Sequence, residues 1–171
     1  MIDKKIVDAL NVQINEEMAS AYLYLAMSAD FKSKNLDGFA SWMKVQTQEE
    51  IVHAMKIYDF LNSRDGKVKL LAINAPQETW SSPLEAFKAA YKHEQYITGC
   101  INKLVKLARD QNDNATELFL GWFVTEQVEE EETASGIVQQ LERIKESSTG
   151  LFMLDAKVGA RVFAAPADGT E

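Results

Sequence analysis

The stretch Gln48–His53, with the sequence QEEIVH, places Glu50 and His53 three residues apart within a long helical segment. Residues three apart on a helix are neighbours on one face, so this carboxylate and this imidazole can point at the same place. Both lie on the apolar stripe of their segment, where a carboxylate is costly unless a partner compensates its charge. One Glu-x-x-His pair is a weak signal, so its meaning depends on the rest of the chain.

Four segments share one pattern, in which apolar residues recur every three or four positions, as in an amphipathic helix, but give way to polar residues at the centre. The expected helices cover residues 3–33, 38–64, 83–110 and 113–146. The central polar residues are Glu17 in the first, Glu50 and His53 in the second, Glu94 in the third, and Gln127 and Glu130 in the fourth. A single mid-helix Glu is usually a solvated residue, and a single His on a stripe is usually a hydrogen-bonded core residue. Four stripes that all become polar at their centres are not expected by chance.

The connections between these segments predict how the helices are arranged. Residues 65–82 have no helical period and contain Pro76, and the helix start signal Ser82-Pro83 stands at their end. At about 3.3 Å per residue this connection could span nearly 60 Å, whereas the second helix is only about 40 Å long. The third helix can therefore run parallel to the second. The prediction is an all-α, up-down-down-up four-helix bundle with one long crossover.

We expect one domain over residues 1–171, because this length is typical of a single domain and hydrophobic residues make up 46% of it. A short apolar helix is expected over 151–163, followed by a disordered tail over 164–171. The net charge of −8 disfavours nucleic acid as a partner. The single cysteine, Cys100, cannot form an internal disulfide, and no apolar run is long enough to cross a membrane. A cytoplasmic protein is expected.

The polar centres predict a metal site. If the helices pack in register, the carboxylates and the imidazole meet at one level of the bundle interior, where uncompensated charges cost many kcal/mol. Cations would remove that cost. Carboxylate oxygens with one imidazole suit iron or manganese better than a metal that prefers thiolates. A pair of ions bridged by Glu50 would neutralise the most charge.

Four motifs resemble the ferroxidase-centre motifs of bacterial non-haem ferritins, a likeness that covers nearly the whole chain. They are Tyr22–Leu25 after Glu17, Gln48–His53, Tyr91–Gln95 and Glu126–Glu131. The resemblance implies a ferritin-like bundle, iron as substrate with O2 or hydrogen peroxide as oxidant, and storage of Fe(III) as a hydrated oxide. It also implies a hollow cage of twenty-four identical subunits, with the fifth helix packed around a fourfold axis.

The same resemblance implies a role for each matching residue. The first iron would be held by Glu17, Glu50 and His53, and the second by Glu94, Glu130 and the bridging Glu50. Gln127 would lie beside the pair and orient water or oxygen, and Tyr24 could supply an electron. A third, weaker iron site would be formed by Glu49, Glu126 and Glu129.

Departures from related families sharpen this hypothesis. Bacterioferritins repeat Glu-x-x-His on the last long helix and carry a Met beside the bridging Glu to hold haem, whereas this chain has Gln127-x-x-Glu130 and Ile51. We therefore predict no haem, and iron that passes through as substrate instead of remaining as a fixed cofactor. Two alternatives stay open: a di-iron peroxidase or oxidase that stores nothing, and a non-catalytic helical assembly protein whose central acids are structural.

Overall fold

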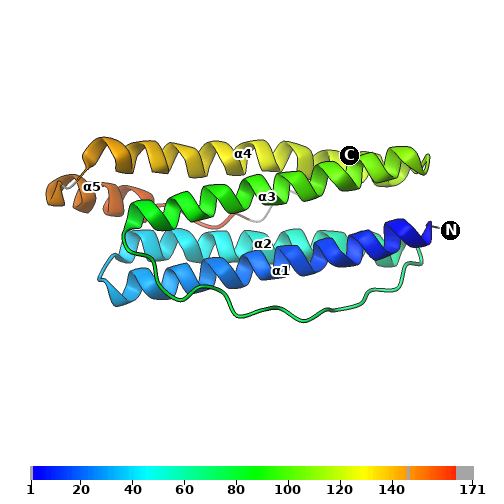
Figure 1. Ribbon diagram of the computed structural model, residues 1–171, viewed down its shortest axis with the longest axis horizontal. Helices are drawn as coiled ribbons and strands as arrows, with labels where there is room; N and C mark the ends of the chain where they lie inside the picture. Colours follow the sequence, from blue (N-terminus) through cyan, green and yellow to red (C-terminus); the bar gives the residue numbers. More distant parts are fainter. Residues whose placement is uncertain (1, 146, 165–171) are drawn as a thin grey trace.

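The computed structural model describes residues 2–145 and 147–164, which form five helices and contain no strand. Four long helices lie side by side, and the crossover between α2 and α3 runs along the outside for the whole length of the bundle (Figure 1). Because of this crossover α2 and α3 point the same way, and the predicted up-down-down-up bundle is confirmed. The helices are α1 (Lys4–Ser33), α2 (Asp37–Ser63), α3 (Pro83–Asp110), α4 (Asn114–Ile144) and α5 (Ser148–Val158).

Local capping accounts for the beginnings of α1 and α3. The Asp3 carboxylate accepts a hydrogen bond from the backbone N–H of Lys5 at 2.8 Å, and α1 begins at the next residue. The Ser82 hydroxyl accepts from the N–H of Glu85 at 3.2 Å, and Pro83 occupies the first position of α3. Such side chains satisfy backbone donors that lack a partner within the helix. These starts were predicted to within one residue.

The fifth helix differs from the prediction, because it covers Ser148–Val158 instead of 151–163. The Ser147 hydroxyl accepts from the N–H of Gly150 at 3.1 Å, so the Ser-Ser-Thr-Gly run is the cap and first turn of α5 and not a connection. The helix ends before Gly159, whose added Cβ would lie 2.6 Å from the Cα of Gly38. Most of the tail expected to be disordered, 165–171, lies outside the described residues; Ala164 belongs to the irregular segment after α5.

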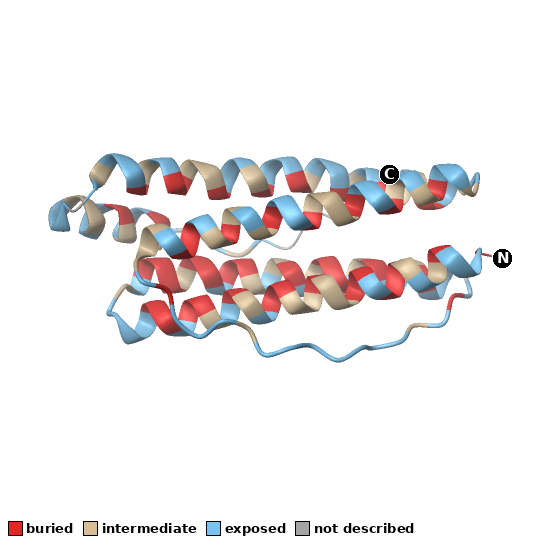
Figure 2. Cartoon of the chain, viewed as in Figure 1, coloured by how far each residue is buried: buried red, intermediate tan, exposed pale blue. Residues whose placement is uncertain are grey.

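The crossover is largely exposed (Figure 2), yet two buried side chains of α1 hold it. The Asn11 side chain donates to the carbonyl of Lys67 at 3.0 Å and accepts from the N–H of Lys69 at 2.6 Å. Near the other end, Asp30 Oδ2 accepts from the backbone N–H of Trp80 at 3.2 Å. These contacts explain how a segment without regular structure keeps one course along the bundle.

Two apolar clusters fill the bundle, and the polar centres of the helices lie between them. One cluster is built around the first half of α1 and includes Leu10, Leu61 and Phe123. The other lies toward α5 and includes Phe31 and Phe87. The buried residues form inward-facing stripes (Figure 2), as the helical periodicity predicted. The fold therefore holds a polar layer between two apolar ones.

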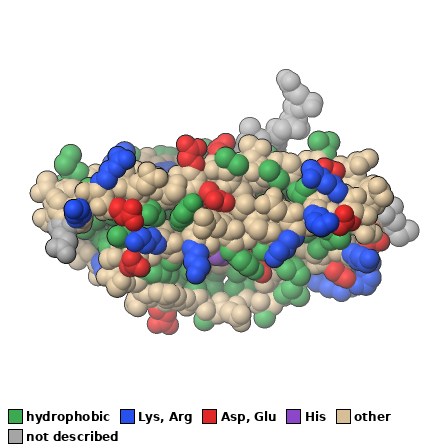
Figure 3. Space-filling view, turned by 45° about the horizontal axis from the view of Figure 1, so that its top comes forward, with side chains coloured by type: hydrophobic (Ala, Val, Ile, Leu, Met, Phe, Trp, Pro, Cys, Tyr) green, Lys and Arg blue, Asp and Glu red, His purple; other side chains and the backbone are tan. Residues whose placement is uncertain are grey.

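The surface carries charges of both signs. Acidic and basic side chains are interspersed on the face in Figure 3, with small hydrophobic areas between them. Within the described residues, every helix is too short or too polar to cross a membrane.

Candidate metal centre

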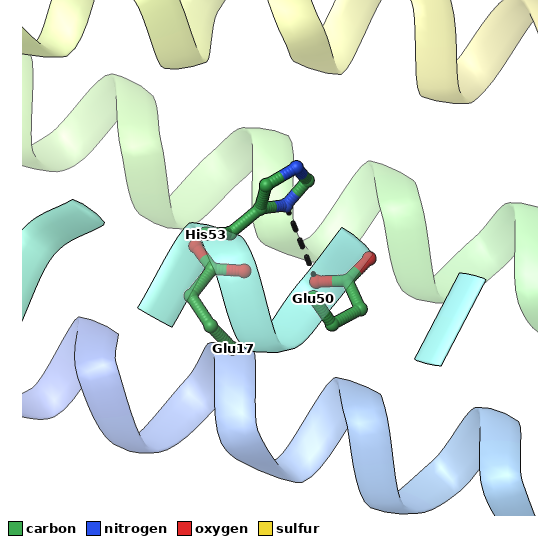
Figure 4. Close-up of side chains that lie close together, drawn as sticks. All are labelled: Glu17, Glu50 and His53. Carbon is green, nitrogen blue, oxygen red and sulfur yellow. Dashed lines mark ion pairs between the residues drawn. The ribbon is translucent and has the colours of Figure 1, made fainter. Parts of the chain in front are cut away.

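The central turns of α1 and α2 bring three potential metal ligands together. Glu17 projects from α1 toward Glu50 and His53 of α2, and one ligand atom from each lies within 4.8 Å of the others (Figure 4). All three residues are at most 2% exposed. The Nδ1 atom of His53 lies 3.5 Å from Glu50 Oε2, so the helical spacing of three residues places them as the sequence predicted.

Two atoms of this group lack hydrogen-bond partners. Among the described residues, three buried side-chain nitrogen or oxygen atoms have no partner, and two of them are Glu17 Oε2 and His53 Nε2. A buried polar atom without a partner costs about 1–3 kcal/mol. Their occurrence on neighbouring carboxylate and imidazole groups fits a site that a cation completes.

The carboxylates of α3 and α4 form the other half of the polar layer. Glu94 accepts hydrogen bonds from the Tyr24 hydroxyl through Oε1 and from Gln127 Nε2 through Oε2, the latter at 3.2 Å. Glu130 Oε2 accepts from Gln46 Nε2 at 2.6 Å. All five side chains are at most 5% exposed. The layer therefore orients its carboxylates through neutral donors.

His53 links the two halves of the layer. Together with Glu126 and Glu130 it forms a second group whose ligand atoms lie within 4.8 Å of one another. Its Nε2 atom lies 3.8 Å from Glu126 Oε1, whereas its Nδ1 atom faces Glu50. The single histidine of the layer is thus placed between two sets of carboxylates.

Burial and mutual repulsion alter the acidity of these groups. Burial is the main cause that raises the pKa values of Glu17 and Glu50 well above the ordinary range, and the charges of neighbouring carboxylates add to it. Burial and the nearby charge of Glu94 raise the pKa of Glu130 to about 8. The pKa of Glu94 is also raised by burial. Without cations the layer therefore retains protons at neutral pH, and a bound metal ion would take their place.

The ligand types restrict the metal. The two groups offer carboxylate oxygens and one imidazole, while Cys100 is only half-buried and belongs to neither group. Such a set suits iron or manganese, and gives no soft sulfur ligand. The residues present therefore fit iron.

Comparison with known proteins agrees with this geometry. The model of the ferritin family, described as a ferritin-like domain, matches residues 7–144. The chain is 42% identical over 161 residues to a bacterial non-heme ferritin of Bacteroides fragilis, covering 94% of this chain and all of that one. A bacterial non-heme ferritin of Staphylococcus aureus is 38% identical over 163 residues, covering 95% of this chain and 98% of that one.

The chain belongs to the ferritin family. Among solved structures, an open pore ferritin from Archaeoglobus fulgidus superposes with a TM-score of 0.94 at 49% identity, covering 95% of this chain and all of the other. The family and the carboxylate–histidine layer together make this chain an iron-storage protein, as its motifs predicted.

The residues predicted for a third iron site are placed unequally in this ferritin. Glu126 is partly buried and lies beside His53. Glu49 is partly buried, and its carboxylate forms an ion pair with Arg161. Glu129 is exposed on α4 and belongs to neither ligand group. The structure thus places Glu126 next to the central layer and gives Glu49 a different partner.

The sequence interpretation did not assign several residues that orient the ligands. Gln13 Nε2 donates to Glu17 Oε1 at 2.8 Å, and Gln46 plays the same part for Glu130. Both glutamines lie on the apolar stripes of their helices, which is the same signal that singled out the acids. Arg161 gave no such signal, because it lay within the short apolar helix expected over 151–163, far along the chain from the four polar centres.

Proposed function

We propose that this ferritin is a ferroxidase that oxidises Fe(II) with O2 or hydrogen peroxide and stores Fe(III) as a hydrated oxide inside a hollow protein cage. The observation that carries the proposal is the buried ligand layer in which Glu17 Oε2 and His53 Nε2 have no protein partner. Iron is the substrate in this scheme, so the layer binds it, promotes its oxidation and releases it.

Two iron ions would share the layer. Glu17, Glu50 and His53 would hold the first, and their ligand atoms already lie within 4.8 Å of one another. Glu94 and Glu130 would hold the second, and Glu50 would bridge the two ions. This arrangement is supported by the nearby charges of Glu94 and Glu130, which add to the effect of burial in raising the pKa of Glu50. Two ions close together can deliver two electrons to one oxidant molecule.

The electrons for the oxidant come from the two iron ions, and the side chains around them would orient the reactants. Two Fe(II) ions each lose one electron, and O2 gains two electrons and two protons to give hydrogen peroxide; hydrogen peroxide as oxidant gains the same to give two waters. The Gln127 amide, held against Glu94, would orient water or oxygen beside the ions. Tyr24, whose hydroxyl donates to Glu94, would hold that carboxylate in position beside the ions.

A third iron position is the weakest part of the assigned site. Glu126 lies next to His53 and could pass iron from the centre toward the cavity. To bind this iron, Glu49 would first have to break its ion pair with Arg161. The exposed side chain of Glu129 would have to turn toward the same iron. We therefore assign Glu49, Glu126 and Glu129 to a transient position and not to a fixed one.

Storage requires an assembly, and the proposal includes a homo-oligomeric cage of twenty-four subunits. The exposed apolar face of α5 supports it, because Phe152 is 75% exposed and Met153 is 66% exposed in the single subunit. Apolar area of this kind marks a contact surface when it is contiguous. Light scattering would test the cage, and a particle of single-subunit mass would contradict it. No haem is included in the proposal, and a cytoplasmic location stays a prediction.

The decisive experiment for storage is iron stoichiometry. The protein is loaded aerobically with excess Fe(II), desalted and assayed for iron and subunits. A storage protein retains many more ions per subunit than its ligand layer can hold. Retention of only the di-iron complement would instead identify a non-storing peroxidase or oxidase, and would overturn the storage part of the proposal.

A further inference from the structure

Arg161, near the C-terminal end of the described chain, contacts two residues of α2 beside the ligand layer. It lies in the irregular segment after α5, and its guanidinium carbon lies over the Trp42 ring, 4.8 Å from the centroid. Its Nη1 donates to Gln46 Oε1 at 2.7 Å, and its Nη2 donates to Glu49 Oε2. The Arg161 side chain is only 25% exposed, so these contacts are largely shielded from solvent.

The docking of the C-terminal segment explains how Arg161 arrives there. Asp155 of α5 accepts hydrogen bonds from the backbone N–H groups of Gly38 and Phe39, at 3.1 and 2.8 Å, and so caps the first turn of α2. Gly38 and Gly159 have no side chains, which lets the two backbones approach closely. The segment that carries Arg161 is thereby fixed to α2, the helix that carries Gln46.

The contact between Arg161 and Gln46 decides which way the Gln46 amide faces. A guanidinium has donors only, so the atom of Gln46 that meets it must be the carbonyl oxygen. The NH2 group must then point the other way, where it donates to Glu130 Oε2 at 2.6 Å. A reversed amide would set its oxygen against a carboxylate oxygen and lose both hydrogen bonds.

We propose that Arg161 is a positioning residue for the iron ligand Glu130, acting through the amide of Gln46. This inference rests on the proposed function and deepens it. Residues that orient metal ligands typically contribute 10–100-fold to metal affinity. Because Glu130 belongs to the second iron position, loss of Arg161 weakens the second ion and leaves the first, held by Glu17 and His53, nearly unchanged.

Anaerobic titration with Co(II), followed by its visible absorption, tests this without any turnover. The full-length, assembled, metal-free protein is used. Wild type is expected to bind two Co(II) per subunit, and R161A to bind the second about 10-fold more weakly. R161K, which keeps a charged donor, recovers part of the loss. An R161A variant whose second Co(II) binds within about twofold of wild type overturns the inference.

A matched variant separates the Gln46 contact from a general effect of charge. Lys157→Ala removes another cation of the same C-terminal part of the chain, one that donates to Gln140 away from the layer. It should keep the second Co(II) affinity of wild type. A loss in Lys157→Ala as large as in R161A would show that Arg161 acts through general charge, contrary to the inference.

A double-mutant comparison completes the test. In a Gln46→Met background, removing Arg161 should change the second Co(II) affinity no further, because the connecting amide is already gone. Additive losses would contradict the inference. If R161A does not assemble, Gln46→Met alone decides: weakened binding supports the route through the amide, and wild-type binding excludes it. Failure of wild type to bind a Co(II) pair would refute the proposed function itself, which distinguishes the two hypotheses.

Discussion

The two ring nitrogens of His53 face different carboxylates: Nδ1 lies 3.5 Å from Glu50 Oε2, and Nε2 lies 3.8 Å from Glu126 Oε1. Neither distance is that of a good hydrogen bond, and Nε2 has no other partner. An imidazole nitrogen that has no hydrogen-bond partner and lies beside carboxylates is suited to bind a metal ion. The relationship makes Glu50 and His53 the pair on which iron oxidation should depend most.

The first prediction therefore concerns the joint substitution of Glu50 and His53 by alanine. The variant should lose at least about 100-fold in the initial rate of Fe(II) oxidation, since even residues that only orient ligands contribute 10–100-fold. Stopped-flow absorption of Fe(III) measures the rate. Glu132→Gln, an exposed acid on α4, is the matched control and should oxidise iron as wild type does. An undiminished rate in the double variant would favour the structural assembly protein instead.

The second prediction concerns the Tyr24 hydroxyl, which donates to Glu94. Tyr24→Phe should still bind two Co(II) ions but oxidise Fe(II) several-fold more slowly, because it loses a hydrogen bond worth about 1.5–3 kcal/mol that orients the Glu94 carboxylate. Tyr22→Phe, an exposed tyrosine on the same helix, serves as control. Equal oxidation rates in the two variants would remove Tyr24 from the mechanism.

The third prediction is a pH dependence of the metal-free protein. Burial and Glu94 raise the pKa of Glu130 from 4.5 to about 8, so the folded state holds this proton more tightly than the unfolded chain. The stability it contributes is complete below pH 4.5 and is lost as the pH rises through 8. Between pH 7 and 9 Glu130 alone should contribute a loss of about 1 kcal/mol to a falling thermal midpoint in calorimetry. Glu17 and Glu50, whose pKa values are also raised, act in the same direction.

Two controls define that pH effect. Glu130→Gln should make the decline between pH 7 and 9 smaller by about 1 kcal/mol, and Glu132→Gln should leave it unchanged. His93 does not contribute between pH 7 and 9. Burial lowers its pKa from 6.5 to about 4, so its protonation favours the unfolded chain and reduces the stability of the fold only below pH 6.5. Co(II) should also abolish the decline, because the cation replaces the proton. A midpoint that rises from pH 7 to 9 without metal would disprove the assigned sign.

The fourth prediction concerns Gly38, where α5 meets α2. An added Cβ would lie 1.8 Å from the backbone oxygen of Asp155, so Gly38→Ala must displace α5 and break its cap on α2. Loss of a helix cap alone costs about 1 kcal/mol, and we expect at least that. Gly99→Ala is the control, since its Cβ meets nothing within 4 Å and should stabilise α3 by about 0.5–1 kcal/mol. Thermal midpoints that move the same way in both variants would argue against the close contact.

Much of the ligand layer could be predicted because its signal is periodic and local. Glu17, Glu94 and Glu130 were found as polar residues on apolar stripes, and helix geometry then required them to face inward. The residues that orient them were harder to assign. A glutamine on a stripe can be a ligand, a donor or an ordinary core amide, and only its partner distinguishes these roles.

The sequence alone determined the long helices, their direction and the level at which their polar centres meet. Capping residues such as Asp3 and Ser82, apolar periodicity and the length of the crossover are all encoded within short stretches of chain. Tertiary structure decided the partners: Glu130 with Gln46, and Gln46 with Arg161, which is 115 residues away along the chain. The reason is physical, because such contacts depend on how α5 docks on α2, and no local pattern encodes that docking.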